Sequence, residues 1–278
     1  MSKYGKYGTL VFVHGGAWGC GRPWHYRLVA NGLGNLLGVR NVVVVGYPTY
    51  PLSTILQQRD CVAEAVRYVQ RDAAVQRLLC ETEGEMVLCG HSSGANICAL
   101  ALLDNMDTTP IAEQQPSHPS ATASTRVKDC SQTHSALNIG TFIGLAGVYD
   151  IGKHYLFESN RGVQVISPMC SAACGRKLFG FCSPTVVAQN MALKLTTSNH
   201  NSVNNSNRNH SNRNSSLNES ILFKTSFPKA VLIHDWGDAT VPISSSIEFS
   251  HALEAIGAQV YMKPVEVKIR IIYNILYV

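Results

Sequence analysis

Short apolar runs alternate along this chain with longer stretches that carry apolar residues at helical spacing. The runs are rich in β-branched residues and bounded by Gly or Pro, which is typical of buried strands. The predicted strands are residues 9–13, 41–47, a run from 86, 141–145, 230–234 and a run from 260. The predicted helices are residues 23–37, 53–79, 95–103 and 244–256. This alternation predicts an α/β fold with a mostly parallel sheet and helices on both faces.

Two polar segments interrupt the alternation. Residues 107–136 are rich in Ser, Thr, Pro and Gln, and residues 195–222 are dominated by Asn and Ser. Such compositions do not build a core, so we predict two disordered, low-complexity insertions in surface loops. Residues 147–192 mix short helical and loop patterns and are a candidate cap over a site. We therefore expect a single domain over residues 1–278.

The composition limits the kinds of binding partner and the compartment that we expect for this chain. The 278 residues are 45% hydrophobic and carry a formal net charge of +5. The basic residues are scattered, so no nucleic-acid partner is expected. No apolar run is long enough to span a membrane and no leader pattern is visible, which favours the cytoplasm. Nine cysteines without a zinc spacing favour reduced thiols and neither metal nor cofactor. Cys61, Cys89 and Cys98 fall in apolar patterns and are expected in the core.

The third predicted strand ends in Gly90-His91-Ser92-Ser93-Gly94, a G-x-S-x-G pattern that is followed by a predicted helix. Strand, sharp turn and helix form the context of a nucleophile elbow, in which a strained turn lifts a serine hydroxyl clear of the sheet. Only small residues fit beside such a turn, and Gly90 and Gly94 meet that need. Ser92 is therefore the candidate nucleophile, with His91 beside it as a candidate substrate-binding residue. The alternative is a structural glycine turn.

The segment His14-Gly15-Gly16-Ala17-Trp18 directly follows the first predicted strand. In a parallel sheet this position lies beside the elbow, because the carboxyl ends of the strands share one edge. Backbone N–H groups near Gly15, Gly16 and Ala17 could turn toward a developing oxyanion, joined by the N–H of Ser93. The alternative is an ordinary glycine turn after a strand.

Asp238 lies in the loop after the strand at 230–234, downstream of Ser92. The order Ser, Asp, His is that of the α/β-hydrolase triad, in which the acid orients the imidazole. Asp235 is the other candidate for this role. Either aspartate could instead be present only to form a turn, because aspartate is common in loops. The only histidine after Asp238 is His251, which lies in a predicted helix, where we expect a surface residue. The sequence therefore identifies no general base.

Together, the segments HGGAW, GHSSGA and HDWGDATVP resemble the α/β-hydrolase fold esterases of the hormone-sensitive-lipase-like group. Within that group the chain is most similar to prenylcysteine methylesterases, of the isoprenylcysteine α-carbonyl methylesterase type. The resemblance covers residues 8–105, 140–192 and 226–266. It implies that Ser92 is the nucleophile and Asp238 the acid. The residues that it implies around the oxyanion are Gly15, Gly16, Ala17 and Ser93.

The same resemblance points to a departure near the C-terminus. Members of the group carry their histidine in a loop just after the strand that here begins near residue 260. In this sequence that position falls near Arg270, within an atypical tail at 267–278. We therefore expect a C-terminally truncated form of the fold, without its last helix. The implied activity is demethylation of prenylcysteine methyl esters, and the implied alternative location is the endoplasmic reticulum or Golgi membrane.

Two other functions stay open. A hydrolase-fold protein that lacks the histidine can bind a ligand without turning it over, as in the gibberellin receptor type of the same superfamily. An arylformamidase or a general carboxylesterase would use the same motifs. In each case the partner is a small molecule or a prenylated-cysteine ester. A histidine after residue 265 is the feature that separates the enzyme from the binding protein.

Overall fold

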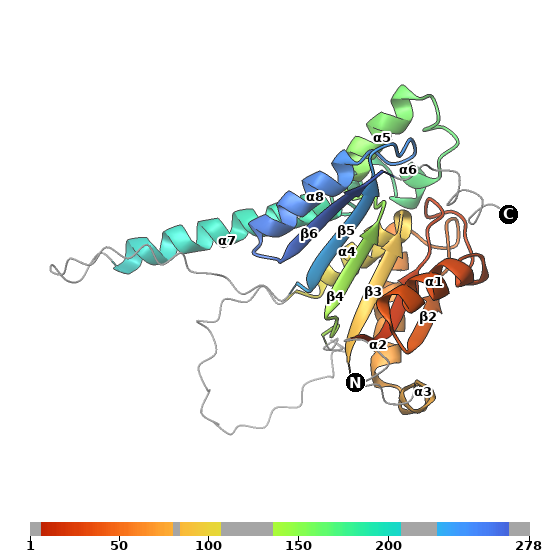
Figure 1. The fold of residues 1–278 in the computed structure, drawn as a ribbon. Coiled ribbons are helices and arrows are strands. Elements are labelled where there is room, and N and C mark those ends of the chain that lie inside the picture. The colour runs from red at the N-terminus through yellow and green to blue at the C-terminus, as the bar shows by residue number, and fades with distance from the viewer. Residues whose placement is uncertain (1–6, 80–83, 107–135, 207–226, 267–278) are drawn as a thin grey trace, which may run out of the picture.

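Every neighbouring pair of strands in the central sheet runs parallel, as the alternating pattern predicts. The structure is a computed structural model in which residues 7–79, 84–106, 136–206 and 227–266 are described. Its strands are β1 (Tyr7–Val13), β2 (Asn41–Val45), β3 (Glu85–His91), β4 (Thr141–Leu145), β5 (Lys229–Asp235) and β6 (Val260–Val265). Their order across the sheet is β2-β1-β3-β4-β5-β6, so β3 ends between β1 and β4 (Figure 1).

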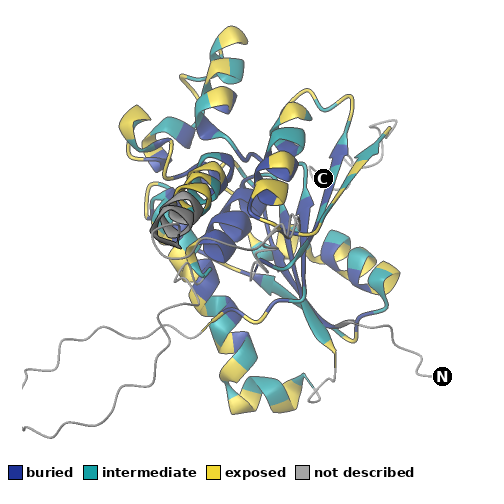
Figure 2. Ribbon diagram, turned by 90° about the vertical axis from the view of Figure 1, so that its left-hand side faces the viewer, coloured by how far each residue is buried: buried dark blue, intermediate teal, exposed yellow. Residues whose placement is uncertain are grey.

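Helices cover both faces of this sheet (Figure 2). On one face lies α1 (Arg27–Leu37), whose Ala30 shares a hydrophobic cluster with Leu10 and Phe12 of β1. Val11 and Val13 point to the opposite face, since side chains alternate along a strand. The helices on that face are α2 (Ile55–Arg71), α4 (Ser93–Asp104), α7 (Pro184–Ser206) and α8 (Ser244–Ala255). The parallel α/β architecture expected from the sequence is confirmed.

Helix α4 is the most deeply placed of these helices. Every residue from 93 to 103 is buried, because β3 covers one side of the helix and α2 and α7 cover others. Its one buried amide, Asn96, donates from Nδ2 to the carbonyl oxygens of Val148 and Cys182, at 2.9 Å each. These bonds tie α4 to the segment 147–192. The helix that follows Ser92 is therefore held on all sides.

One predicted helix is divided in two. The pattern over 53–79 forms α2 and a short α3 (Ala73–Leu78), because Asp72 leaves the helical conformation between them. The Asp72 carboxylate accepts the N–H groups of Ala74 and Val75 at 3.0 and 2.9 Å, which caps α3. The predicted helix 23–37 likewise begins with a separate 3₁₀ turn, η1 (Pro23–His25).

The segment 147–192 supplies α5 (Ile151–Asn160), α6 (Met169–Ala172), the 3₁₀ turn η3 (Arg176–Leu178) and the start of α7. Helices α5 and α6 lie beyond the carboxyl ends of the strands (Figure 1). Helix α7 continues to Ser206, into the predicted insertion at 195–222. The rest of that insertion, most of the insertion at 107–136 and the tail at 267–278 lie outside the described residues. Within the described part of the chain, no helix is both long and apolar enough to cross a membrane.

The seven cysteines of the described residues are all free thiols. Cys89 and Cys98 are buried in the core, as predicted. The prediction for Cys61 was wrong, since this residue is exposed on α2. Its neighbours Val62 and Ala63 take the buried face of the helix, and the helical turn leaves Cys61 on the solvent side.

Candidate active site

Ser92 occupies the sharp corner between β3 and α4. Its backbone has φ 53° and ψ −122°, a strained conformation that residues with a side chain rarely adopt. Its N–H donates to the carbonyl oxygen of Leu145, at the end of β4, at 2.8 Å. The side chain is half-buried, and its hydroxyl makes no hydrogen bond to any described residue. Ser92 is thus fixed through its backbone, while no described residue engages its hydroxyl.

Two glycines allow this corner to form. A Cβ at Gly94 would lie 2.4 Å from the carbonyl oxygens of both Val13 and His14, far inside contact distance. A Cβ at Gly90 would lie 2.6 Å from the backbone of Ala95. The first turn of α4 therefore packs directly against the end of β1. This close approach explains why the G-x-S-x-G pattern needs glycine on both sides of the serine.

The first three carbonyl groups of the loop after β1 are each held by a donor within the protein. The carbonyl oxygen of His14 accepts the hydroxyl of Tyr47 at 2.7 Å. The carbonyl oxygen of Gly15 lies 2.9 Å from Nδ1 of His14. The carbonyl oxygen of Gly16 accepts the N–H of Cys20 at 3.0 Å. These contacts fix the orientation of three successive peptide groups.

The N–H groups of the same peptides have no acceptor among the residues that the structure describes. In a trans peptide the N–H points opposite to the C=O, so the N–H groups of Gly15, Gly16 and Ala17 point away from the groups that hold the carbonyls. None of them donates to a described residue, and neither does the N–H of Ser93. A Cβ placed on Gly15 would lie 3.0 Å from Cβ of Ser92. Gly15 and Ser93 therefore flank the serine, and oxyanion binding stays a prediction for these N–H groups.

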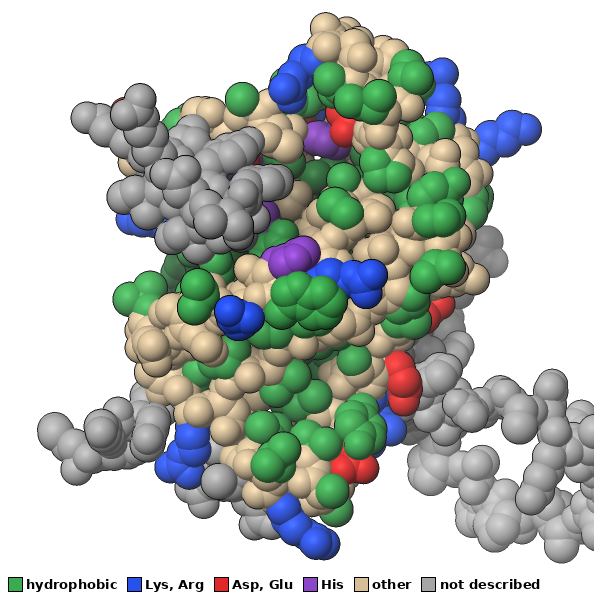
Figure 3. Space-filling model, turned by 90° about the vertical axis from the view of Figure 1, so that its right-hand side faces the viewer, with side chains coloured by type: hydrophobic (Ala, Val, Ile, Leu, Met, Phe, Trp, Pro, Cys, Tyr) green, Lys and Arg blue, Asp and Glu red, His purple; other side chains and the backbone are tan. Residues whose placement is uncertain are grey.

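A hollow of about 340 Å³ lies on the α1 side of this loop and is lined by His14, Tyr47, Arg22 and Trp24 among others. On this side of the molecule hydrophobic and basic side chains are exposed together (Figure 3). Trp18, at the end of the same loop, is 1% exposed and belongs to the core. Among the described residues, no group of three or more His, Cys, Asp or Glu is placed to hold a metal ion.

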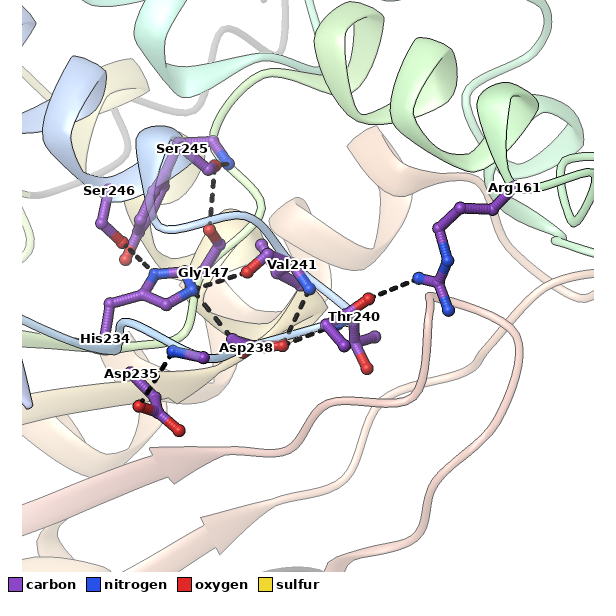
Figure 4. A network of polar contacts seen from close by, with 12 residues as sticks. Gly147, Arg161, His234, Asp235, Asp238, Thr240, Val241, Ser245 and Ser246 are labelled. Carbon is purple, nitrogen blue, oxygen red and sulfur yellow. Dashed lines mark hydrogen bonds and ion pairs between the residues drawn. The ribbon is translucent and has the colours of Figure 1, made fainter. Parts of the chain in front are cut away.

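Asp238 is held in the loop after β5 by three groups (Figure 4). Its Oδ1 accepts the N–H groups of Thr240 and Val241 at 2.8 and 3.0 Å, and its Oδ2 lies 3.5 Å from Nε2 of His234. Partial burial raises the pKa of this carboxyl, but the three contacts outweigh burial and hold the pKa below its ordinary value. Oδ1 of Asp235, the competing acid, accepts the N–H of Gly237, two residues along the same loop, at 3.2 Å. Asp238 is therefore a charged, oriented carboxylate at neutral pH.

Both ring nitrogens of the buried His234 are engaged. Nε2 lies 2.8 Å from the carbonyl oxygen of Val241, and Nδ1 lies 2.7 Å from Oγ of Ser246. A carbonyl oxygen only accepts, so Nε2 carries the proton and Nδ1 accepts from the Ser246 hydroxyl. His234 thus fastens the loop of Asp238 to β5 and α8. It has no nitrogen left to take a proton from Ser92.

His91 lies between the elbow and the loop after β1. A Cβ placed on Gly15 would be 3.0 Å from Nδ1 of His91, and the ring of Tyr26 lies 6.0 Å from the His91 ring. Burial lowers the pKa of His91 to about 4, against the opposing effect of the Asp238 carboxylate. The imidazole is therefore neutral at pH 7. Because the charge of Asp238 acts on this ring, the acid loop lies near the elbow.

No described histidine contacts the Ser92 hydroxyl. His251 is exposed on α8, the surface position that the sequence favours. The N–H of Trp236 donates to the carbonyl oxygen of Val265 at 3.0 Å, so the chain leaves β6 beside the loop of Asp238. The position near Arg270, where the resemblance places the histidine, lies outside the described residues. The sequence has no histidine after His251.

Tyr47 and Gln58 shape the site, and the motifs did not reveal them. Both belong to the segment that follows β2, far in sequence from the loop that they contact. Gln58 donates from Nε2 to the carbonyl oxygen of Trp18 at 2.9 Å. The one available signal was a glutamine on the otherwise apolar, buried face of α2. A buried amide needs a partner, which would have indicated a polar contact there.

Comparison with known proteins gives the fold family of the chain. The family described as alpha/beta hydrolase fold matches residues 10–198, more than half of the chain. The chain belongs to this family. The matched region begins in β1 and ends in α7, so it includes the elbow and the loop after β1. It ends before Asp238.

Two curated plant proteins are similar to the chain. The probable isoprenylcysteine alpha-carbonyl methylesterase ICME of Oryza sativa subsp. japonica is 25% identical over 260 residues. The isoprenylcysteine alpha-carbonyl methylesterase ICME of Arabidopsis thaliana is 24% identical over 255 residues. Each alignment covers 90% of this chain but only 48% and 47% of the relatives. The chain thus spans about half the length of the curated relatives it matches.

Solved structures show the same fold. Esterase B from Lactobacillus rhamnosis, in an inhibited form, matches with a TM-score of 0.61 at 14% identity and covers 98% of this chain and 71% of that chain. Carboxyl esterase 2 from Tuber melanosporum matches with a TM-score of 0.57 at 14% identity, over 95% of this chain and 69% of that chain. At these identities the likeness establishes the hydrolase fold alone.

Proposed function

We propose that this protein is a serine hydrolase of carboxylic esters, with Ser92 as the nucleophile. The observation that carries the proposal is a strained serine whose hydroxyl no described residue engages, flanked by backbone N–H groups that have no described acceptor. In the proposed reaction Oγ of Ser92 attacks the ester carbonyl carbon, and the N–H groups of Gly15, Gly16 and Ser93 bind the resulting oxyanion. The Ser92 proton leaves to solvent as the Oγ–C bond forms, and collapse breaks the ester C–O bond and expels the alkoxide, which takes a proton from water to leave as the alcohol. A second water then hydrolyses the acyl-enzyme to the carboxylic acid and restores the Ser92 hydroxyl.

The proposed acid is Asp238. Its carboxylate is charged at neutral pH and held by two N–H groups, which suits it to orient an imidazole. No described histidine hydrogen-bonds to the Ser92 hydroxyl. We therefore propose that this chain acylates through Ser92 but turns over slowly, because loss of one triad member typically costs several orders of magnitude while oxyanion binding leaves a remnant.

The proposed substrate is the methyl ester of a prenylated cysteine. Support comes from the two curated methylesterases, each of which aligns along 90% of this chain. An arylformamidase or a general carboxylesterase would need the same serine and N–H groups. Parallel assays with a prenylcysteine methyl ester, p-nitrophenyl acetate and an aryl formamide separate these substrate classes by kcat/KM.

A ligand-binding protein on the hydrolase fold is the second candidate. It is favoured by one observation, that both nitrogens of His234 are engaged and no other described histidine hydrogen-bonds to the Ser92 hydroxyl. Such a protein would bind an ester or its acid without covalent reaction. Calorimetric binding of a non-hydrolysable ester analogue, together with no covalent labelling of Ser92, is the expected outcome for this candidate.

Labelling with a fluorophosphonate probe tests the main proposal. The wild-type protein should be labelled at Ser92, as located by mass spectrometry, and Ser92→Ala should not be labelled. Ser244→Ala is the matched control, because it removes an exposed hydroxyl at the start of α8. Equal labelling of the wild type and Ser92→Ala would rule out Ser92 as the nucleophile.

A further inference from the structure

The segment after β2 clamps both ends of the loop that follows β1. At the start of the loop, the Tyr47 hydroxyl donates to the carbonyl oxygen of His14 at 2.7 Å. At its end, the carbonyl oxygen of Trp18 accepts the N–H of Tyr50 at 2.8 Å and Nε2 of Gln58 at 2.9 Å. Both side-chain donors are buried. Between these two anchors lie the N–H groups that have no described acceptor.

Tyr47 acts on two successive peptide groups of this loop. Its hydroxyl fixes the carbonyl of His14, which turns the N–H of Gly15 the opposite way. Its ring stacks on the His14 imidazole, with centroids 4.4 Å apart and planes inclined by 13°. The same imidazole holds the carbonyl of Gly15 at 2.9 Å, which directs the N–H of Gly16. One side chain thus sets the direction of both glycine N–H groups.

The environment keeps the Tyr47 hydroxyl a donor. Burial raises the pKa of this phenol well above its ordinary value, so the proton stays in place across the neutral range. The Ser93 side chain faces the same phenol, although its hydroxyl is outside hydrogen-bonding geometry. Tyr47 therefore lies where the loop after β1 meets the first turn of α4. These two elements carry the N–H groups that flank Ser92.

We propose that Tyr47 is a positioning residue that preorganises the oxyanion-binding N–H groups for the reaction at Ser92, an inference that rests on the proposed esterase function. Such donors stabilise the transition state only if their direction is fixed before charge develops. Their interaction with the neutral ester is weaker than with the oxyanion. Loss of the positioning hydroxyl should therefore lower kcat and leave KM nearly unchanged.

Tyr47→Phe keeps the ring and its stacking on His14 and removes only the donor. Tyr50→Phe is the matched control, because its hydroxyl makes no hydrogen bond to a described residue and its tie to the loop is through the backbone. With p-nitrophenyl acetate we expect Tyr47→Phe to lower kcat about tenfold with KM within about twofold of the wild type. An alkyl boronic acid that forms a tetrahedral adduct with Ser92 should lose affinity by the same factor. Tyr50→Phe should leave kcat, KM and boronate affinity within about twofold.

Several results would overturn this inference. If kcat of Tyr47→Phe stays within about twofold of the wild type while Ser92→Ala is far slower in the same assay, Tyr47 has no positioning role. The esterase proposal would then still stand. Parallel losses in boronate affinity and in affinity for the product acid indicate a merely structural role. If Tyr47→Phe does not fold, the test passes to Gln58→Leu at the other end of the loop. This variant must then show a lowered kcat with a nearly unchanged KM. Equal rates for the wild type and Ser92→Ala would remove the esterase proposal, and the role of Tyr47 with it.

Discussion

Nε2 of His234 and Oδ2 of Asp238 lie 3.5 Å apart, and the proton on that nitrogen is directed to the carbonyl oxygen of Val241 at 2.8 Å. The same imidazole accepts from Ser246 on α8, and Arg161 of the segment 147–192 donates to the carbonyl oxygen of Ala239 (Figure 4). The loop that carries Asp238 is therefore held from three directions. The position of the proposed acid depends on residues that take no part in the reaction.

Replacing His234 should loosen this loop. His234→Ala leaves the Val241 carbonyl and the Ser246 hydroxyl without their partner and opens a cavity, so we expect a loss of about 2–4 kcal/mol in the free energy of unfolding. The carboxyl of Asp238 loses one of the contacts that lower its pKa. Urea unfolding measures the loss. His251→Ala is the control, since this histidine is exposed on α8 and should leave both stability and Ser92 labelling unchanged. A His234→Ala protein as stable as the wild type would contradict the anchoring role.

The close approach of α4 to β1 gives a second prediction. Gly94→Ala places a Cβ 2.4 Å from two backbone carbonyl oxygens, which cannot move aside as a flexible side chain can. We expect it to lower the free energy of unfolding by about 3 kcal/mol. Gly32→Ala in α1 is the matched control, because a Cβ there meets nothing within 4 Å. It should raise stability by about 0.5–1 kcal/mol through helix propensity. Thermal unfolding of the two variants should shift in opposite directions.

The sequence predicted the strands and loops of this site better than the side chains that hold the loops in place. The strands, the sharp turn at Ser92 and the loop after β5 follow from apolar runs and turn residues, which are local signals. The division of the helix at 53–79 was missed because capping by the Asp72 side chain competes with a continuous apolar pattern. Tyr47 could not be found, because a side chain that bonds a backbone carbonyl far away in sequence leaves no spacing to recognise.

The role of His234 shows a related limit. In the sequence it is a histidine near an aspartate, which is compatible with catalysis and with structure alike. Only the contacts of both ring nitrogens, to Val241 and Ser246, decide in favour of structure. The charged state of Asp238 depends in the same way on N–H groups that only the folded loop brings to it.

The buried imidazole of His91 should make stability depend on pH. Its pKa falls from 6.5 to about 4 on folding, so between these values the unfolded chain binds a proton that the folded protein does not. Stability therefore falls as the pH is lowered through this window, by about 2 kcal/mol from His91 between pH 7 and pH 5. His14, whose pKa is also lowered by burial, acts in the same direction. Asp238 has a lowered pKa, so its contribution is lost only below the ordinary pKa of a carboxyl.

Urea unfolding at pH 7 and pH 5 measures this difference. His91→Gln replaces the titrating imidazole with a neutral side chain of similar size. The free energy of unfolding of this variant should fall less between pH 7 and pH 5 than that of the wild type, by about 2 kcal/mol. Because the comparison is made within each variant, a constant destabilisation from the substitution cancels. An equal pH dependence in the two proteins would mean that folding does not lower the pKa of His91.

The exposed cysteines should react with an alkylating agent faster than the buried ones. Cys20, Cys61 and Cys174 are exposed, whereas Cys89 and Cys98 are buried and their thiol pKa values are raised by burial. The thiolate is the reactive form, so these three exposed cysteines should be alkylated at once in native buffer. Cys89 and Cys98 should be alkylated only as fast as the protein unfolds. Peptide mass spectrometry after timed iodoacetamide treatment resolves each site. Urea provides the control, because all of these thiols should then react at similar rates.

The lack of a described base at Ser92 predicts an unusual pH–rate profile. A serine activated by histidine gains reactivity up to the pKa of the imidazole, near pH 7, and then reaches a plateau. Without that contact the proton must leave to solvent, so the logarithm of the rate of fluorophosphonate labelling should rise steadily between about pH 6 and 9. His91, with a pKa of about 4, adds no inflection in this range. Ser92→Ala supplies the background at each pH. A plateau near pH 7 would show that a base does reach Ser92, and the proposal of slow turnover would then fail.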